Sequence, residues 1–432
     1  MSELERIHTA IPGPRSNELR VLTEMYEARG VTYFGADYPV FWESAHGALV
    51  SDVDGNRYID LTSAFGVANA GHANERVVEA IVAQAHTLIH GMGDVHPTES
   101  KALLLQLLAA ITPGDLQKTY LTTSGSEAVE FALKTAVLAT GKAHFLAYRG
   151  AYHGLSLGAL DVIGIDKFRA PFATLLAQRT TLLDYPRAND STNDALAAAR
   201  SALEADPEIG AIVLEPIQGR GGVIVPPLGF LSGLRALCDE RGVLLILDEI
   251  YTGFGRTGTM FACERENVVP DLMCIGKAIA GGVPLSATIG RPHVMDAWAK
   301  SEGEALHTST YLGNPLACAA ALANIAELER LDVLARVRTR EGTLAQRLAS
   351  FVTTFANVLE ARGIGFMWAL EFATAADANR VVVDGLARGI ILLQSGPTGT
   401  SITIAPPLVI SDGELARGLD LLEAALQAKV DS

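Results

Sequence analysis

The stretch Val243-Leu244-Leu245-Ile246-Leu247-Asp248 and the later stretch Leu272-Met273-Cys274-Ile275-Gly276-Lys277 decide the fold. Each is a short, almost continuous apolar run, which is typical of a strand that is covered on both faces of a sheet. The first run ends at Asp248, and Lys277 follows the second. Because parallel strands end at the same edge of a sheet, we expect this carboxylate and this amine to lie close together.

Further strand-like runs flank these two, and helical stretches separate most of them. The expected strands are 118–122, 144–148, 211–214, 243–247, 272–275 and 286–289, and the intervening helices include 194–204 and 230–240. This alternation predicts an α/β fold with a large, mostly parallel sheet.

The two ends of the chain follow a different pattern. Residues 1–30 are polar, and we expect them to be irregular, whereas 31–62 indicate a small antiparallel unit. A helical stretch over 316–358 leads to mixed strands and helices and to an amphipathic helix near 412–428. We therefore expect a large domain over 71–315 and a smaller α+β domain over 316–432, to which the N-terminal segment 1–70 contributes.

Composition excludes several classes of function. Hydrophobic residues make up 49% of the 432 residues, which is enough for a large core, and no apolar run approaches the ~18 residues of a membrane span. The net charge of −15 argues against nucleic acid or a membrane as partner. The N-terminus has no apolar signal region, and the four cysteines lack metal spacing. We expect free thiols, no metal and a cytoplasmic location.

A candidate anion site follows the strand 118–122. Ser124 and Glu127 have the spacing of a capping box, and Gly125 and Ser126 lie between them. A helix N-terminus with exposed N–H groups, a glycine for close approach and nearby hydroxyls can bind a phosphate. Taken alone, an ordinary helix cap is the better interpretation, because capping boxes are common.

Two further candidates stand at the ends of other strands. Tyr152 and His153 lie between Gly150 and Gly154, where an aromatic ring could stack on a flat cofactor or simply pack in a turn. Glu215 ends the run 211–214, so its carboxylate either points into a ligand crevice or is a solvated loop acid.

The pairing of Asp248 with Lys277 suits pyridoxal 5′-phosphate (PLP). The amine forms a Schiff base with this cofactor, and the carboxylate keeps the pyridine nitrogen protonated. Ile250 could pack behind the ring. Apolar neighbours such as Ile275 and Ile279 should desolvate Lys277 and lower its pKa, which frees the amine as a nucleophile.

Set together, these motifs resemble the class III aminotransferases, the group of 4-aminobutyrate, ornithine and ω-amine transaminases. The resemblance covers nearly the whole chain and is most specific over 247–282. It implies the fold type I architecture of PLP-dependent transferases and a homodimer with shared active sites. It also implies roles: phosphate binding by Gly125 and Ser126, ring stacking by Tyr152, and a phosphate contact from the neighbouring subunit by Thr310. The full set of expected cofactor contacts is Ser124, Gly125, Ser126, Tyr152, His153, Glu215, Asp248, Ile250, Tyr251, Lys277 and Thr310.

The chain departs from the family pattern at its substrate side. Thr403 occupies the position of an arginine that clamps a substrate carboxylate in amino-acid-using members, and one hydroxyl cannot replace a bidentate guanidinium. Arg220 and Arg256 are candidates to take over that duty. Phe65 falls where members line the substrate pocket. Glu215 resembles the glutamate that pairs with the missing arginine, so we expect it to be free for a cationic substrate group.

Tyr251 stands where many members have a glutamine near the cofactor's 3′-oxygen, and its hydroxyl could do similar work.

The resemblance implies amino-group transfer between an amine or ω-amino donor and a keto or aldehyde acceptor. Lys277 and Asp248 are the expected catalytic residues, and Phe65, Glu215 and Thr403 the expected substrate pocket. A PLP-dependent racemase or epimerase would use the same Lys277 but return the proton to the substrate carbon. A non-catalytic PLP-fold binding protein is a third possibility, which the retention of both Lys277 and Asp248 argues against.

Overall fold

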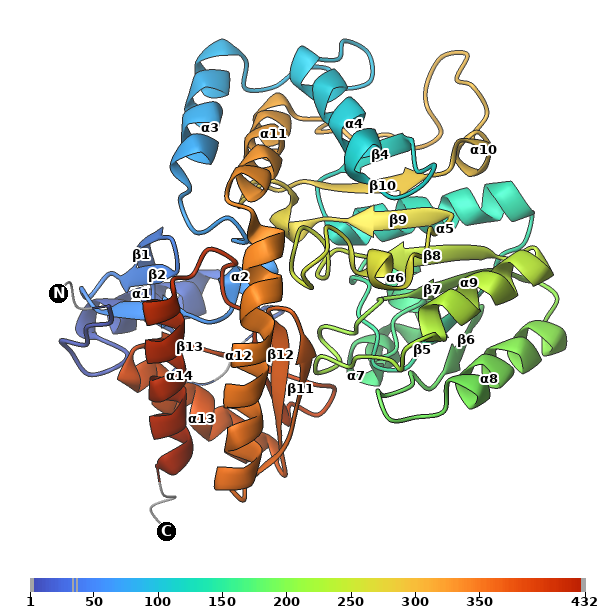
Figure 1. The fold of residues 1–432 in the computed structure, drawn as a ribbon. Coiled ribbons are helices and arrows are strands. Elements are labelled where there is room, and N and C mark those ends of the chain that lie inside the picture. The colour runs from blue at the N-terminus through green and yellow to red at the C-terminus, as the bar shows by residue number, and fades with distance from the viewer. Residues whose placement is uncertain (1–3, 33–34, 36–37, 429–432) are drawn as a thin grey trace.

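A seven-stranded sheet forms the centre of the larger part of the molecule (Figure 1). The computed structural model describes residues 4–32, 35 and 38–428. The strand order is β4 (Lys118–Thr122), β10 (Ser286–Gly290), β9 (Leu272–Ile275), β8 (Leu244–Asp248), β7 (Ile209–Leu214), β5 (His144–Tyr148) and β6 (Thr180–Leu183). Strands β9, β8, β7, β5 and β6 are parallel, and β10 runs antiparallel to both neighbours. The expected mostly parallel sheet is confirmed.

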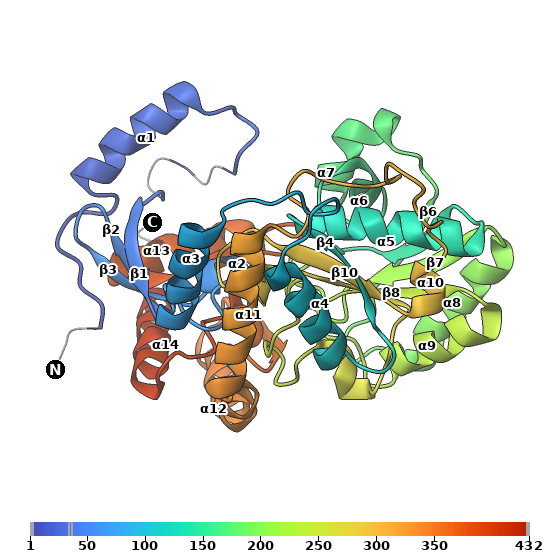
Figure 2. The same ribbon diagram turned by 90° about the horizontal axis from the view of Figure 1, so that it is seen from above.

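Helices cover both faces of this sheet (Figure 2). Helix α5 (Gly125–Thr140) lies on one face, and α4 (Glu99–Ile111), α8 (Thr192–Ala205) and α9 (Phe230–Arg241) lie on the other. Alternate strand residues belong to two different hydrophobic clusters, so that Ile246 packs with α5 and Leu245 packs with α9. This two-sided burial is why the strands are apolar throughout, and it leaves their carboxyl ends as the place for polar side chains.

The two ends of the chain meet in the smaller part of the molecule. Strands β1 (Trp42–His46), β2 (Leu49–Asp52) and β3 (Arg57–Asp60) form the expected antiparallel unit, and β13 (Ile390–Ile391) joins β3 in parallel. A second sheet has the order β11 (Val358–Ile364), β12 (Met367–Phe372), β15 (Ser401–Ile404) and β14 (Leu393–Ser395). Because β13 pairs with β3, we propose that 1–70 and 316–432 form one small domain and that 71–315 form the large one.

Helices α13 (Ala375–Arg388) and α14 (Asp412–Gln427) complete this part, and α3 (Glu75–Thr87) packs against α11 (Pro315–Arg330). The shorter helices are α2 (Ser63–Gly66), α6 (Leu157–Asp161), α7 (Asp166–Arg169), α10 (Pro292–Met295), η1 (Ala170–Leu175), η2 (Ala262–Glu266) and η3 (Lys277–Ile279).

One expectation for the ends of the chain is wrong. Residues 1–30 are not irregular throughout, because α1 spans Pro14–Tyr26. The carboxylate of Asp54 accepts the backbone N–H groups of Arg15 and Ser16 at 2.7 and 2.9 Å and so caps this helix from a distant turn. The helical stretch expected over 316–358 is present as two helices, because α11 ends at Arg330 and α12 spans Val333–Thr354, with Asp332 in the left-handed conformation between them.

Among the residues that the structure describes, no helix is both long enough and apolar enough to cross a membrane.

Candidate active site

Asp248 and His153 form a buried pair at the carboxyl end of β8. Their exposed fractions are only 4% and 2%, and His153 Nδ1 lies 2.8 Å from Asp248 Oδ2. Because a carboxylate only accepts, Nδ1 carries the proton of this hydrogen bond. Burial alone would lower the pKa of His153, but the hydrogen bond and the charges of Asp248 and Glu215 outweigh it and raise the pKa. The other ring nitrogen, Nε2, is buried and has no hydrogen-bond partner among the described residues.

Lys277 follows β9, the strand next to Asp248. Asp248 is in register with Cys274 of β9, so that the expected meeting of carboxylate and amine at one sheet edge occurs. Lys277 has a φ of 47°, the left-handed conformation that a non-glycine residue seldom adopts. Burial lowers the pKa of its ammonium, while the charges of Asp248 and Glu215 oppose that effect. The side chain therefore has the character of an available amine, as the flanking sequence predicts.

Glu215 lies in the same cluster, and both of its carboxylate oxygens accept hydrogen bonds from the backbone. Its Oε1 accepts the backbone N–H of Tyr152 at 2.9 Å, and its Oε2 accepts that of Gly219 at 2.8 Å. Burial, with the nearby charge of Asp248, raises the pKa of Glu215 to about 7, although His153 opposes the shift. The expectation that Glu215 is free for a cationic substrate group is therefore wrong, because both oxygens hold backbone in place.

The N-terminus of α5 opens toward this cluster. Ser124 accepts the Glu127 N–H and completes a capping box, so the helix cap that competed with the anion site is present. A Cβ at Gly125 would lie 2.7 Å from Ile250 Cδ1, so a larger residue there would displace the end of the Ile250 side chain. Gly125 and Ser126 hold the first two N–H groups of the helix, which have no partner within it.

Ser156 is a neighbour of this helix start that the sequence does not indicate. The Ser156 N–H donates to Ser126 Oγ at 3.0 Å, and the two hydroxyls lie 2.6 Å apart. Ser156 has no motif of its own; only its place shortly after Gly154, which packs on Ser126, connects it with the site.

Tyr251 lines the space in front of Lys277. Its ring centroid is 4.5 Å from Lys277 Nζ, and burial raises the pKa of its hydroxyl to about 12. Gly66 and Gly219 both touch the ring, because a Cβ on either would lie 2.3 Å from a ring carbon. Phe65, beside Gly66, has a φ of 63° and is 61% exposed. This strained segment therefore brings Phe65 to the edge of the same space.

Two expected site residues belong to other parts of the chain. Thr403 in β15 is 2% exposed, and its hydroxyl donates to Ser395 Oγ at 2.7 Å. It lies opposite Ala369 of β12, whose hydrophobic cluster includes Tyr251. Thr310 lies in the segment between α10 and α11 and is exposed. Within the described part of this single chain, Thr310 makes no hydrogen bond to the other candidate residues.

Arg256 is not available as a substrate clamp. It is fully buried, and its guanidinium donates to the carbonyls of Phe366 and Pro406, to Ser63 Oγ and to Asn69 Oδ1. Burial lowers its pKa to about 10. This arginine therefore ties the loop after β8 to the smaller part of the molecule.

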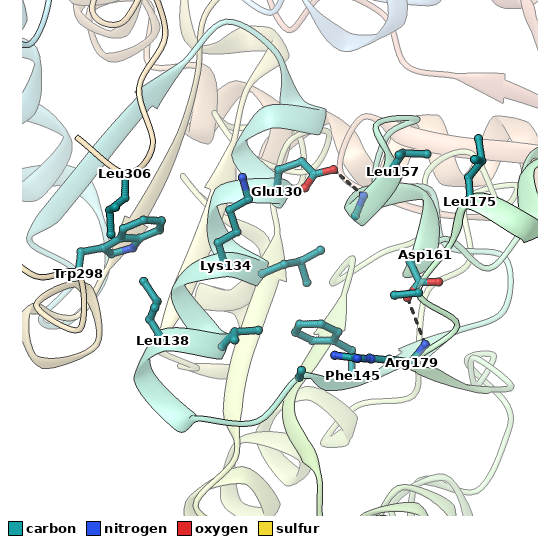
Figure 3. Close-up of a pocket in the computed structure, with 15 residues that line it drawn as sticks. Glu130, Lys134, Leu138, Phe145, Leu157, Asp161, Leu175, Arg179, Trp298 and Leu306 are labelled. Carbon is teal, nitrogen blue, oxygen red and sulfur yellow. Dashed lines mark hydrogen bonds between the residues drawn. The ribbon is translucent and has the colours of Figure 1, made fainter. Parts of the chain in front are cut away.

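A separate hollow of about 600 Å³ lies beside α5 (Figure 3). Apolar side chains such as Leu138, Phe145, Leu157, Trp298 and Leu306 line most of it. None of the candidate residues above is among its lining residues, so this hollow is distinct from the cluster around Lys277.

Comparison with known proteins identifies the family. The Aminotransferase class-III family profile matches residues 33–426. The chain belongs to the class III aminotransferases. It is 39% identical to a putrescine aminotransferase of Pectobacterium atrosepticum over 396 residues, which covers 89% of this chain and 82% of that protein.

Solved structures of class III transaminases share the fold. An amine transaminase from an uncultivated Pseudomonas species, solved with PLP bound, is 30% identical and gives a TM-score of 0.85 over 93% of this chain and 97% of that one. A transaminase from the marine bacterium Virgibacillus is 26% identical, with a TM-score of 0.89 over 95% and 98% of the two chains. The protein is thus a fold type I, PLP-dependent aminotransferase.

The residues present fit this cofactor. The buried cluster contains a carboxylate fixed by a histidine, a histidine nitrogen without a partner and an amine with a lowered pKa. The space beside Gly125, which a Cβ would fill, lies at the N-terminus of α5, and a helix N-terminus can bind a phosphate.

Proposed function

We propose that this aminotransferase moves an amino group from an amine donor without a recognised carboxylate to a keto-acid or aldehyde acceptor, with Lys277 as the reactive amine. The observation that carries the proposal is the placement of Lys277 and Asp248 at the carboxyl ends of two adjacent parallel strands. Partial burial lowers the pKa of Lys277, which makes its amine a useful nucleophile and base.

Within this proposal PLP carries the amino group between the two half-reactions and provides the electron sink. Lys277 would hold the cofactor through Nζ, and as general base it would move a proton at the substrate carbon. The lowered pKa of Lys277 supports both roles, because a neutral amine is required for each.

Asp248 would hold the pyridine nitrogen of the cofactor. His153 orients the carboxylate from one oxygen, and the Ile250 N–H donates to the other at 3.0 Å. Tyr152, whose backbone N–H donates to Glu215, would stack on the ring. Ile250, which lies close to Gly125 and Gly276, would pack behind it. Ser124, Gly125 and Ser126 would bind the phosphate at the N-terminus of α5. The hydroxyl of Tyr251 would lie near the 3′-oxygen.

We further propose a homodimer in which Thr310 of one subunit completes the phosphate site of the other. Thr310 is exposed, and its neighbours Leu306 and Tyr311 are 82% and 58% exposed. A partner subunit that covered Thr310 would also cover these two apolar side chains. The proposed compartment is the cytoplasm, which the four free, buried cysteines support.

The donor class follows from the substrate side of the site. Thr403 is a buried hydroxyl that already donates to Ser395, and Arg256 is committed elsewhere, so neither offers a cation to a donor carboxylate. A diamine or monoamine needs no such contact. The similarity to a putrescine aminotransferase supports an aliphatic diamine as donor.

A panel of donors tests this proposal. Putrescine, a simple aliphatic monoamine, 4-aminobutyrate and ornithine would each be supplied at equal concentration with pyruvate or 2-oxoglutarate, and amino transfer to the keto acid measured. We expect the carboxylate-free amines to have the higher kcat/KM. A strict preference for 4-aminobutyrate would refute the donor class, and racemisation of an amino acid without keto-acid consumption would identify the racemase alternative.

A further inference from the structure

Arg220 is a cation in the loop after β7, and its guanidinium has no ion pair or hydrogen bond in the described part of the chain. It is half-buried and directly follows Gly219, which lies so close to Tyr251 that a Cβ there would be 2.3 Å from the ring. A partly buried arginine without a carboxylate, phosphate or carbonyl is unusual, because the five donors of a guanidinium need acceptors.

The neighbouring arginines show the contrast. Arg362, which contacts the same loop, donates to the Gly222 carbonyl at 2.8 Å and to Glu360, Glu371 and Ser401. Arg256 is surrounded by four acceptors. Both are therefore structural, and Arg220 alone of these three arginines has its charge uncommitted.

The position of Arg220 connects it with the reactive amine. Gly219 touches the ring of Tyr251, and that ring lies 4.5 Å from Lys277 Nζ. On the cofactor side, the charge of Arg220 reaches Tyr152, where it partly offsets the rise in pKa that burial causes. Arg220 thus follows the glycine that lies against Tyr251, and its charge acts on Tyr152.

The same loop also touches the hairpin that carries Thr403. The Arg220 carbonyl accepts the Gly396 N–H at 3.0 Å, and Gly396 directly follows β14, the partner strand of β15. Ser395, the residue before Gly396, holds the Thr403 hydroxyl. Arg220 and Thr403 therefore lie on two segments that contact each other. Arg220 could then supply the positive charge that an arginine at position 403 supplies in amino-acid-using members of the family.

We propose that Arg220 binds the carboxylate of the keto-acid acceptor, in place of an arginine at position 403. This inference rests on the proposed function, because it assigns a residue to the second half-reaction of amino transfer. A planar guanidinium forms two parallel hydrogen bonds to a carboxylate, which fixes the orientation of the adjacent carbonyl carbon. A carboxylate-free amine makes no use of this contact, so one site accepts both substrates.

The test compares Arg220→Gln and Arg220→Lys with wild-type holoenzyme. Arg200→Gln is the matched control, because Arg200 is a half-buried arginine on α8 that pairs with Glu240. With one saturating amine donor, kcat/KM would be measured for 2-oxoglutarate and for butanal, an aldehyde without a carboxylate. Binding of glutarate to each holoenzyme would be measured by calorimetry, which requires no turnover.

We expect Arg220→Gln to lower kcat/KM for 2-oxoglutarate about ten- to a hundred-fold and to weaken glutarate binding to a similar extent. The value for butanal should change less than about three-fold. Arg220→Lys should recover part of the loss, since it restores the charge but not the fork. Arg200→Gln should behave as wild type.

An unchanged value for 2-oxoglutarate, an equal loss for both acceptors, or unchanged glutarate binding would each overturn the assignment of Arg220. A wild-type enzyme that accepts no amino group from any amine would refute the proposed function instead, and the glutarate titration would still decide the role of Arg220.

Discussion

His153 Nδ1 lies 2.8 Å from Asp248 Oδ2, and both side chains are buried at the carboxyl end of the central sheet. The histidine leaves the second carboxylate oxygen to the Ile250 N–H and to a ligand. The pair therefore fixes the orientation of the Asp248 carboxylate, which holding a pyridine N–H requires.

Replacing His153 should weaken cofactor binding. His153→Gln removes a hydrogen bond to a charged group, which costs ~1.5–3 kcal/mol, or roughly a ten- to hundred-fold higher Kd for PLP. Equilibrium dialysis of PLP measures the effect. His144→Gln is the matched control, because His144 pairs with Asp206 at the same 2.8 Å distance on the surface. Equal PLP affinity in wild type and His153→Gln would contradict the proposed role.

Glu215 should make stability depend on pH in a defined direction. Its pKa is raised from 4.5 to about 7 in the folded protein, so the folded state holds the proton more tightly than the unfolded state. The stability from this proton is fully present below pH 4.5 and is lost as pH rises through about 7.

Glu215→Gln removes this titration in the cofactor-free protein. The stability of wild type relative to the variant should fall between pH 4.5 and about 7 and then level off. Melting temperatures of both proteins across this range measure it, with the exposed Glu99→Gln as control. A difference that is constant with pH would show that Glu215 ionises normally.

An arginine at position 403 should change the donor preference. Thr403→Arg would supply the guanidinium that amino-acid-using members of the family carry there, and we expect kcat/KM for 4-aminobutyrate to rise about ten- to a hundred-fold. Because Thr403 is 2% exposed, Thr403→Val serves as control for loss of the hydroxyl alone. If wild type already uses 4-aminobutyrate as its best donor, the interpretation of Thr403 is wrong.

Thr310 should act across a subunit boundary. Thr310→Val should raise the Kd for PLP about ten-fold or more, since a hydrogen bond to a charged phosphate is lost. The exposed Thr353→Val on α12 should have no effect. Light scattering and activity assays over a dilution series provide the second measurement. Full activity in a monomer would exclude a contribution from the partner.

The sequence predicts the central sheet well because burial on both faces produces continuous apolar runs. Strand β9 is found as expected at Leu272–Ile275, and β8 differs from its expected range by one residue at each end. The helix α1 could not be predicted in this way, since its cap is Asp54 from a distant turn. Asp332 breaks the long C-terminal helix without a glycine or proline to signal it.

The meeting of Asp248 with Lys277 was predictable because it depends only on strand ends. That both carboxylate oxygens of Glu215 accept hydrogen bonds could not be predicted. The donors are the backbone N–H groups of Tyr152 and Gly219, which only the loop conformations bring together. The same holds for Arg256, whose acceptors come from both ends of the chain.

The central claim is that Lys277 is the residue that binds PLP covalently. Borohydride reduction of the PLP-loaded enzyme, followed by proteolysis and mass spectrometry, tests it most directly. We expect the phosphopyridoxyl label on the peptide that contains Lys277 and on no other lysine, and Lys277→Ala should take up no label. A label on a different lysine, or an unlabelled Lys277 in fully loaded enzyme, would contradict the account.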